Sequence, residues 1–131
     1  MKKRILSVVL ALTMVIGSFN VVFAGTDSAI LIDADYAYAT AYTECDDYTG
    51  FASTSCYPSS NVTSSSSFVS AKLYAYAASA VDSDSDNSSS AGTLNVSVEL
   101  SYYVSNVSRI SSNHSVTLDG VKTSTELNAS N

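Results

Sequence analysis

Three aspartates stand two residues apart in the stretch VDSDSDNSSSAGT, and this spacing is the clearest chemical signal in the chain. Asp82, Asp84 and Asp86 match positions one, three and five of a calcium-binding loop, and Asn87 offers a further oxygen ligand. An EF-hand loop has glycine at position six and glutamate at position twelve, whereas this stretch has Asn87 and Thr93 there. We therefore expect either a weak calcium site, binding at about 10⁻⁴–10⁻³ M as extracellular modules do, or a solvated polar loop between two strands. No other cofactor is expected.

The residue types of hydrolytic enzymes are present without their motifs. His114 is the only histidine, and serine is so abundant that finding Ser, His and Asp together carries little information. The chain has no G-x-S-x-G, no H-E-x-x-H and no phosphate-binding glycine loop. His114 is in phase with Val116 and Leu118, which predicts a packed or half-exposed histidine on a strand. We expect a protein that is not an enzyme.

The phrase YAYA occurs twice, beginning at Tyr36 and at Tyr74. On a strand, such a phrase places tyrosines on one face and alanines on the other. One interpretation is structural, because the alanine face can approach another layer closely while the rings cover sheet surface. The other is an exposed binding face for a glycan or a protein, since tyrosine supplies a large contact area with a polar tip. That face would consist of Tyr36, Tyr38, Tyr42, Tyr74 and Tyr76.

Cys45 and Cys56 are the only two cysteines. An even pair in an exported protein predicts one disulfide. A hairpin between the flanking strands would carry the two cysteines at its ends, where a cross-strand bridge is expected. A zinc or redox pair lacks partners, because the chain has no C-x-x-C and a single histidine.

The first 24 residues have the pattern of a secretory signal peptide. A basic start, Met-Lys-Lys-Arg, precedes an apolar run that ends in Val22-Phe23-Ala24, which predicts cleavage after Ala24. The alternative is a membrane anchor, but the apolar run is short and a small-residue cleavage site follows it. The start is typical of bacteria, so we expect a secreted bacterial protein whose mature part, residues 25–131, forms one domain.

After residue 24, three basic residues remain against twelve acids, a net charge of −9. Such a chain should repel nucleic acid and anionic membrane surfaces, and it has no later segment apolar enough to span a bilayer. We therefore expect neither a nucleic acid nor, after signal cleavage, a membrane as its partner.

Apolar residues recur with a period of two, which indicates strands rather than helices. The clearest case is residues 94–105, where Leu94, Val96, Val98 and Leu100 alternate with polar residues. The other expected strands are 30–43 as one long or two short strands, 51–57, 68–81, 114–118 and 121–127, the last two joined by an Asp119-Gly120 turn. Turns or loops are expected at 46–50, 58–61, 64–67 and 106–113, and a frayed tail at 128–131.

Six or seven strands without a convincing helix predict a small all-β antiparallel sandwich with immunoglobulin-like or Greek-key connections. A small closed β-barrel is the alternative. We expect this domain to bind an extracellular protein or glycan, or to self-associate through edge strands around Tyr36–Tyr42 and Tyr74–Ala80. Two alternatives are a secreted bacteriocin-like or toxin-like effector and a weak calcium-binding extracellular module.

Overall fold

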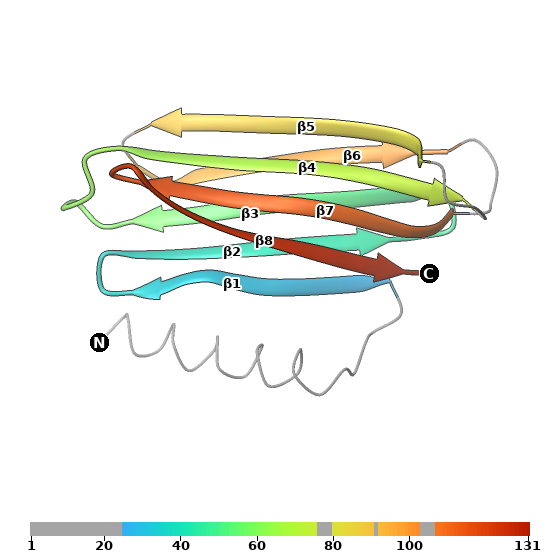
Figure 1. Cartoon of the computed structure of the whole chain (residues 1–131), viewed down its shortest axis with the longest axis horizontal. Coiled ribbons are helices and arrows are strands. Elements are labelled where there is room, and N and C mark those ends of the chain that lie inside the picture. The colour runs from blue at the N-terminus through green and yellow to red at the C-terminus, as the bar shows by residue number, and fades with distance from the viewer. Residues whose placement is uncertain (1–24, 76–79, 91, 103–106) are drawn as a thin grey trace.

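Two four-stranded antiparallel sheets pack face to face as a sandwich that is not closed into a barrel (Figure 1). The computed structural model describes residues 25–75, 80–90, 92–102 and 107–131, and of Ser108 only the backbone. The predicted signal peptide, residues 1–24, and Tyr76 lie outside the described residues. The predicted sandwich is confirmed, and the barrel alternative is wrong.

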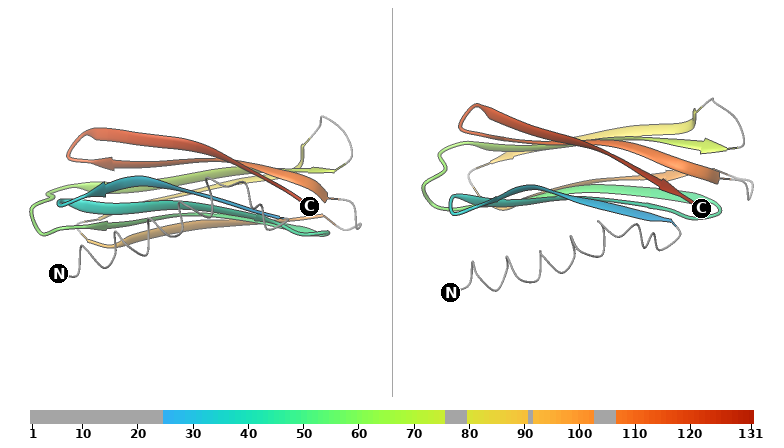
Figure 2. Two further views of the ribbon diagram at one scale, coloured as in Figure 1. Left: turned by 90° about the horizontal axis from the view of Figure 1, so that it is seen from below. Right: turned by 60° about the horizontal axis from the view of Figure 1, so that its bottom comes forward.

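The strands are β1 (Thr26–Ala34), β2 (Ala37–Cys45), β3 (Thr49–Pro58), β4 (Ser65–Ala75), β5 (Ala80–Ser90), β6 (Leu94–Ser101), β7 (Val107–Leu118) and β8 (Val121–Ser130). Sheet A has the order β1-β2-β3-β6, and sheet B has the order β5-β4-β7-β8. After β5 in sheet B, the chain crosses to sheet A, where β6 pairs with β3. It then returns to sheet B, where β7 pairs with β4. These are Greek-key connections. Figure 2 shows the two layers from two further sides. No helix in the described part of the chain is long and apolar enough to cross a membrane.

Several segments that were expected to be loops are strands. Residues 81–90 of the aspartate stretch lie in β5, residues 65–67 of the serine tract begin β4, residues 107–113 begin β7, and the expected tail extends β8 to Ser130. These residues have weak strand propensity, but β4 and β7 supply continuous hydrogen-bonding partners for them. Neighbouring strands therefore override local propensity. Two tyrosine-rich segments were expected at sheet edges, but β2 and β4 are inner strands.

The interior consists of two apolar clusters with a polar layer between them. Along β3, Thr54 separates Ala52 of one cluster from Cys56 of the other. Along β7, His114 takes the same position between Ile110 and Val116. All six side chains are at most 1 % exposed. The prediction that His114 packs on the same face of its strand as Val116 and Leu118 is therefore confirmed.

The predicted Asp119-Gly120 hairpin turn is present. Both residues have positive φ, 47° and 83°, as a type I′ turn requires. Oδ1 of Asp119 also accepts hydrogen bonds from the backbone N–H groups of Thr63 and Ser64, at 3.0 and 2.8 Å. The Thr63 hydroxyl and these backbone N–H groups hold the pKa of Asp119 below its ordinary value. The turn is thus tied to the β3–β4 connection.

Candidate functional site

The two cysteines are not paired, which corrects the predicted disulfide. In the β2–β3 register Cys45 lies opposite Gly50, beside the turn, whereas Cys56 lies opposite Ala39. Cys45 and Ala39 are six positions apart on one strand, or about 20 Å. A disulfide requires Cα atoms within about 7 Å, so the hairpin itself separates the thiols. Both are buried, and burial raises the pKa of Cys45 to about 11 and that of Cys56 above its ordinary value, so neither is a reactive thiolate.

The three aspartates of β5 lie on the inner face of an edge strand. Asp82, Asp84 and Asp86 are opposite Leu73, Ala71 and Val69 of β4, all of which point into the sandwich. From there the carboxylates reach the edge of β6 in the other sheet. The backbone N–H of Ser101 donates to Asp82 Oδ2 at 3.0 Å, and that of Ser97 donates to Asp86 Oδ2 at 3.4 Å. The aspartates thus close one flank of the sandwich.

An inward-pointing carboxylate also contacts the facing sheet on the opposite flank. Asp27 of edge strand β1 lies opposite the buried Thr43, and its Oδ2 accepts the backbone N–H of Asn128 in β8 at 3.0 Å. Inward-pointing charges on edge strands are a known defence against pairing with another chain. The expectation of self-association by edge pairing therefore loses support on both flanks.

The predicted calcium ligands are not gathered around one point. Consecutive aspartates of β5 are spaced by two strand residues, about 7 Å, and Asn87 projects from the opposite face. No group of three or more His, Cys, Asp or Glu side chains in the described ranges could hold a metal ion.

His114 is enclosed rather than available for catalysis. The Thr54 hydroxyl donates to the carbonyl of Phe68 at 2.9 Å and lies 2.8 Å from His114 Nδ1. Because that hydroxyl has a single proton, Nδ1–H donates to it, and Nε2 accepts from the Ser112 hydroxyl at 2.7 Å. Burial lowers the pKa of His114 to about 4. The ring is a neutral bridge between the two sheets.

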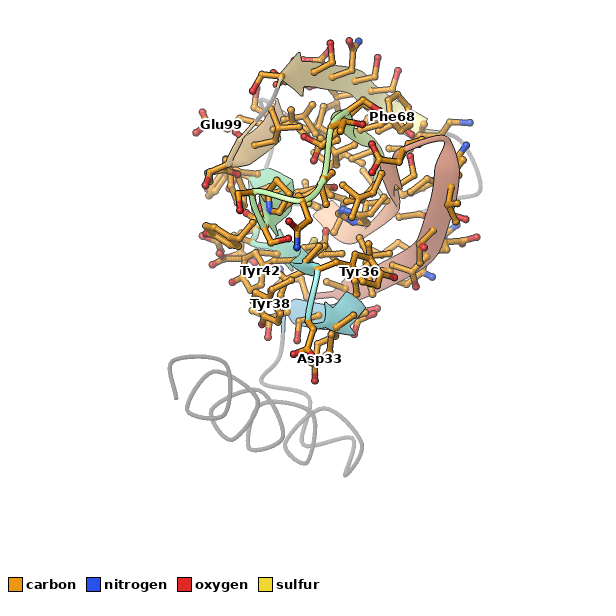
Figure 3. All side chains as sticks on the ribbon, turned by 90° about the vertical axis from the view of Figure 1, so that its left-hand side faces the viewer. Asp33, Tyr36, Tyr38, Tyr42, Phe68 and Glu99 are labelled. Atoms are coloured by element: carbon orange, nitrogen blue, oxygen red, sulfur yellow. The ribbon has the colours of Figure 1, made fainter. Side chains whose placement is uncertain are left out.

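The predicted tyrosine face is divided between the two sheets. Tyr38 and Tyr42 lie on the outer face of sheet A, and Figure 3 shows both rings on the same side of the molecule as Glu99. Tyr36 lies in the β1–β2 turn, and Tyr74 lies on the outer face of sheet B. Tyr76 is outside the described residues. The structural interpretation of YAYA holds for β2, because Ala37, Ala39 and Ala41 are buried on the inner face.

Two aromatic residues that the sequence analysis missed complete the surface on sheet A. Tyr57 lies directly opposite Tyr38, with the rings stacked at 6.2 Å between centroids and an interplanar angle of 18°. Phe51 is tilted against Tyr42 at 6.3 Å and 53°. Counting outward from the β2–β3 turn at period two would have found both. We call Tyr38, Tyr42, Phe51 and Tyr57 the aromatic face.

Hydroxyl and carboxylate groups surround the aromatic face. Thr40, Ser53 and Ser55 lie among the rings, and Tyr57 itself is 49 % exposed. The Tyr42 hydroxyl donates to Glu44 at 2.9 Å, and burial together with that carboxylate raises the pKa of Tyr42 to about 12.

Burial and the nearby Asp33 likewise raise the pKa of Tyr38. These two phenols therefore stay protonated, as neutral hydrogen-bonding groups, at any physiological pH. Beyond them, a shallow groove over Phe51 is lined by Glu44 and Glu99.

Comparison with family models, curated proteins and solved structures finds no significant match to this chain.

Proposed function

We propose that this chain is a secreted bacterial protein without enzymatic activity that binds a partner at the cell exterior through its aromatic face. One observation carries the proposal: the central strands of sheet A present their large aromatic side chains to solvent. Strands β2 and β3 bury alanine, threonine, cysteine and glycine, while Tyr38, Tyr42, Phe51 and Tyr57 point outward. Rings that are not used to fill the core are available for contact with another surface.

The composition of the aromatic face suits a partner with both flat apolar and polar surface. Tyrosine provides large contact area and loses few rotamers on binding, which is why it is enriched in interfaces. The hydroxyls of Thr40, Ser53 and Ser55 between the rings can donate and accept hydrogen bonds. Both a sugar ring and a protein surface have this mixture of groups.

Two features of the sandwich support binding rather than catalysis. The single histidine has both ring nitrogens engaged inside the core. The carboxylates of Asp27, Asp82 and Asp86 are held against backbone N–H groups of the facing sheet. These groups stabilise the sandwich and are not presented to a substrate.

Cosedimentation of the purified mature protein with washed bacterial cells and with purified peptidoglycan tests this proposal. We expect the wild type to pellet, and the double variant Tyr38→Thr/Tyr57→Thr to stay in solution. The matched control is Tyr36→Thr/Tyr48→Thr, which removes two exposed tyrosines in the turns at the ends of sheet A. The proposal fails if neither probe pellets the wild type, or if the face variant pellets as the wild type does.

A further inference from the structure

All three basic residues that follow residue 24 lie on the outer face of sheet B. Lys72 projects outward from β4, because its neighbours Ala71 and Leu73 are buried. Arg109 of β7 lies opposite Tyr74, with its guanidinium 3.9 Å from the ring centroid. Lys122 of β8 lies opposite Thr117 and is exposed. Glu126 is the acidic residue among the outward positions of β8. The outer face of sheet B is therefore basic in a strongly acidic protein.

The outer face of sheet A has the opposite charge. Glu44 and Glu99 flank Phe51 in one row across the sheet, because Glu44 lies opposite Phe51 and Phe51 lies opposite Glu99. Asp33 lies opposite Tyr38 at the other end of the aromatic face. Each outer face thus has two like charges toward one end and one toward the other.

The spacing of these charges matches along the strands. On sheet A the row of Asp33 and the row of Glu44 are six positions apart, from Tyr38 to Glu44 on β2. On sheet B the rows of Lys122 and Lys72 are also six positions apart, from Thr117 to Ser111 on β7. Six strand residues span about 20 Å on either face.

The charges also match across the sheets. Strands β1 and β8 share one flank of the sandwich, and β6 and β5 share the other, as the carboxylate contacts described above require. Asp33 and Lys122 therefore lie on the same flank, and both lie near the end that holds the β1–β2 and β7–β8 turns (Figure 1). Moving one molecule along the sandwich normal, without turning it over, places β1 over β8, β2 over β7 and β6 over β5. Asp33 then faces Lys122, Glu44 lies two strand residues short of Arg109, and Glu99 lies one strand away from Lys72.

We propose that the partner of the aromatic face is a second copy of this chain, which docks the basic outer face of its sheet B onto sheet A in the same orientation. This inference rests on the proposed function, because it assigns a partner to the same surface. The two surfaces differ and lie on opposite sides of each molecule, so the contact is heterologous and leaves both ends open for further copies. The inward-pointing aspartates of β1 and β5 contact the facing sheet on each flank. The stack therefore grows face to face and not edge to edge.

The size of the contact sets its strength. Four strands of about nine residues form a face of roughly 19 by 30 Å, or roughly 600 Å². Two full faces bury roughly 1,200 Å² together, the lower end of specific interfaces. Association should therefore be reversible and should depend on protein concentration.

A charge exchange tests the docking. Sedimentation velocity of the mature protein at increasing concentration is expected to show a growing series of oligomers. Lys72→Glu/Lys122→Glu reverses sheet B, and Glu44→Lys/Glu99→Lys reverses sheet A; each is expected to weaken association about tenfold or more. Mixing the two variants should restore oligomers larger than pairs, because the two unchanged faces form the native contact and the two reversed faces are again complementary. Arg109 is left unchanged, since it packs on Tyr74.

The control for added negative charge away from both faces is Ser60→Asp/Asn61→Asp, in the exposed β3–β4 connection. It lowers the net charge by two, half of the change in Lys72→Glu/Lys122→Glu. It should associate as the wild type does. Mixed with Glu44→Lys/Glu99→Lys it should form shorter stacks, because that variant docks through its unchanged sheet B but presents a reversed sheet A to the next copy. Circular dichroism shows whether each double variant folds. If one of them does not, the single variants Lys72→Glu and Glu99→Lys are mixed in their place.

Three results would overturn the inference. The first is a wild type that stays monomeric at every concentration. The second is association that Tyr38→Thr/Tyr57→Thr abolishes but the reversal of sheet B does not change. The third is a mixture that behaves as its separate components do. None of these results bears on the proposed binding function, which the cosedimentation experiment tests. Failure of the self-docking inference can therefore be distinguished from failure of the proposed function.

Discussion

The central strands of the two sheets distribute bulk in opposite ways. Strands β2 and β3 of sheet A turn small side chains inward and aromatic ones outward. Strands β4 and β7 of sheet B turn valine, leucine, isoleucine and histidine inward. Their outward positions hold serine, asparagine and threonine together with Phe68, Lys72, Tyr74 and Arg109. The central strands of sheet B, together with β6 of sheet A, therefore fill the interior against the small inward side chains of β2 and β3. This difference supports the proposal that the aromatic residues of sheet A contact a partner rather than fill the core.

The strongest test of this comparison removes bulk from sheet B. Ile110→Ala creates a cavity at a fully buried position, and we expect a loss of about 2–5 kcal/mol in the free energy of unfolding. Ser111→Ala, on the outer face of the same strand, should change it by less than about 0.5 kcal/mol. Urea denaturation measures both. Equal effects would mean that sheet B does not supply the core.

The converse change adds bulk to sheet A. Ala52 is fully buried on β3, and Ala52→Leu should cost about 1–3 kcal/mol, because the facing layer has no room for it. Ser53→Leu, one residue along and pointing outward, should change stability by less than about 0.5 kcal/mol. An Ala52→Leu protein as stable as the wild type would show that the sheets are not closely apposed.

Where the sheets meet through His114, stability should depend on pH. The folded pKa of about 4 lies below the unfolded value near 6.5, so the unfolded chain binds more protons between them. The contribution is complete above pH 6.5 and is lost as the pH falls toward 4, with about 2 kcal/mol gone by pH 5. Urea titrations across this window measure the slope. His114→Gln should flatten it, and an unchanged slope would assign the pH dependence to carboxylates instead.

The smallest effect is expected from calcium. Because Asp82 and Asp86 already accept β6 N–H groups, millimolar calcium should leave the midpoint of thermal unfolding within about 1 °C of its value in EDTA. Weak calcium binding stays a prediction until this is measured. A rise that Asp84→Ala abolishes would show that the aspartates can regroup around an ion.

Strands could be predicted from the sequence where apolar and polar residues alternate strictly. They could not be predicted where pairing with a neighbouring strand determines the structure. The alternation of β6 and the Asp119-Gly120 turn were sufficient signals. The stretch from Asp82 to Ser90 has no apolar alternation, because its inner face carries aspartates that reach a strand of the other sheet. No local sequence pattern indicates that the side chains of a strand contact a strand of the other sheet.

The site shows the same limit. Tyr38 and Tyr42 were identified as candidates, but Tyr57 and Phe51 join them only through the β2–β3 register. The disulfide prediction was wrong for the same reason: it took two ends of a hairpin as neighbours, although the register separates Cys45 from Cys56. Spacing along the chain is informative about faces, and register is needed for contacts.

The most direct test of the central claim measures two quantities on one variant, Tyr38→Thr/Tyr57→Thr. The first is the free energy of unfolding, and the second is the fraction that pellets with washed cells. If the aromatic face serves contact, stability should fall by less than about 1 kcal/mol, the value of a cross-strand pair, while the bound fraction is lost. A loss of stability as large as that of Ile110→Ala, with binding unchanged, would contradict the account and make the rings part of the fold alone.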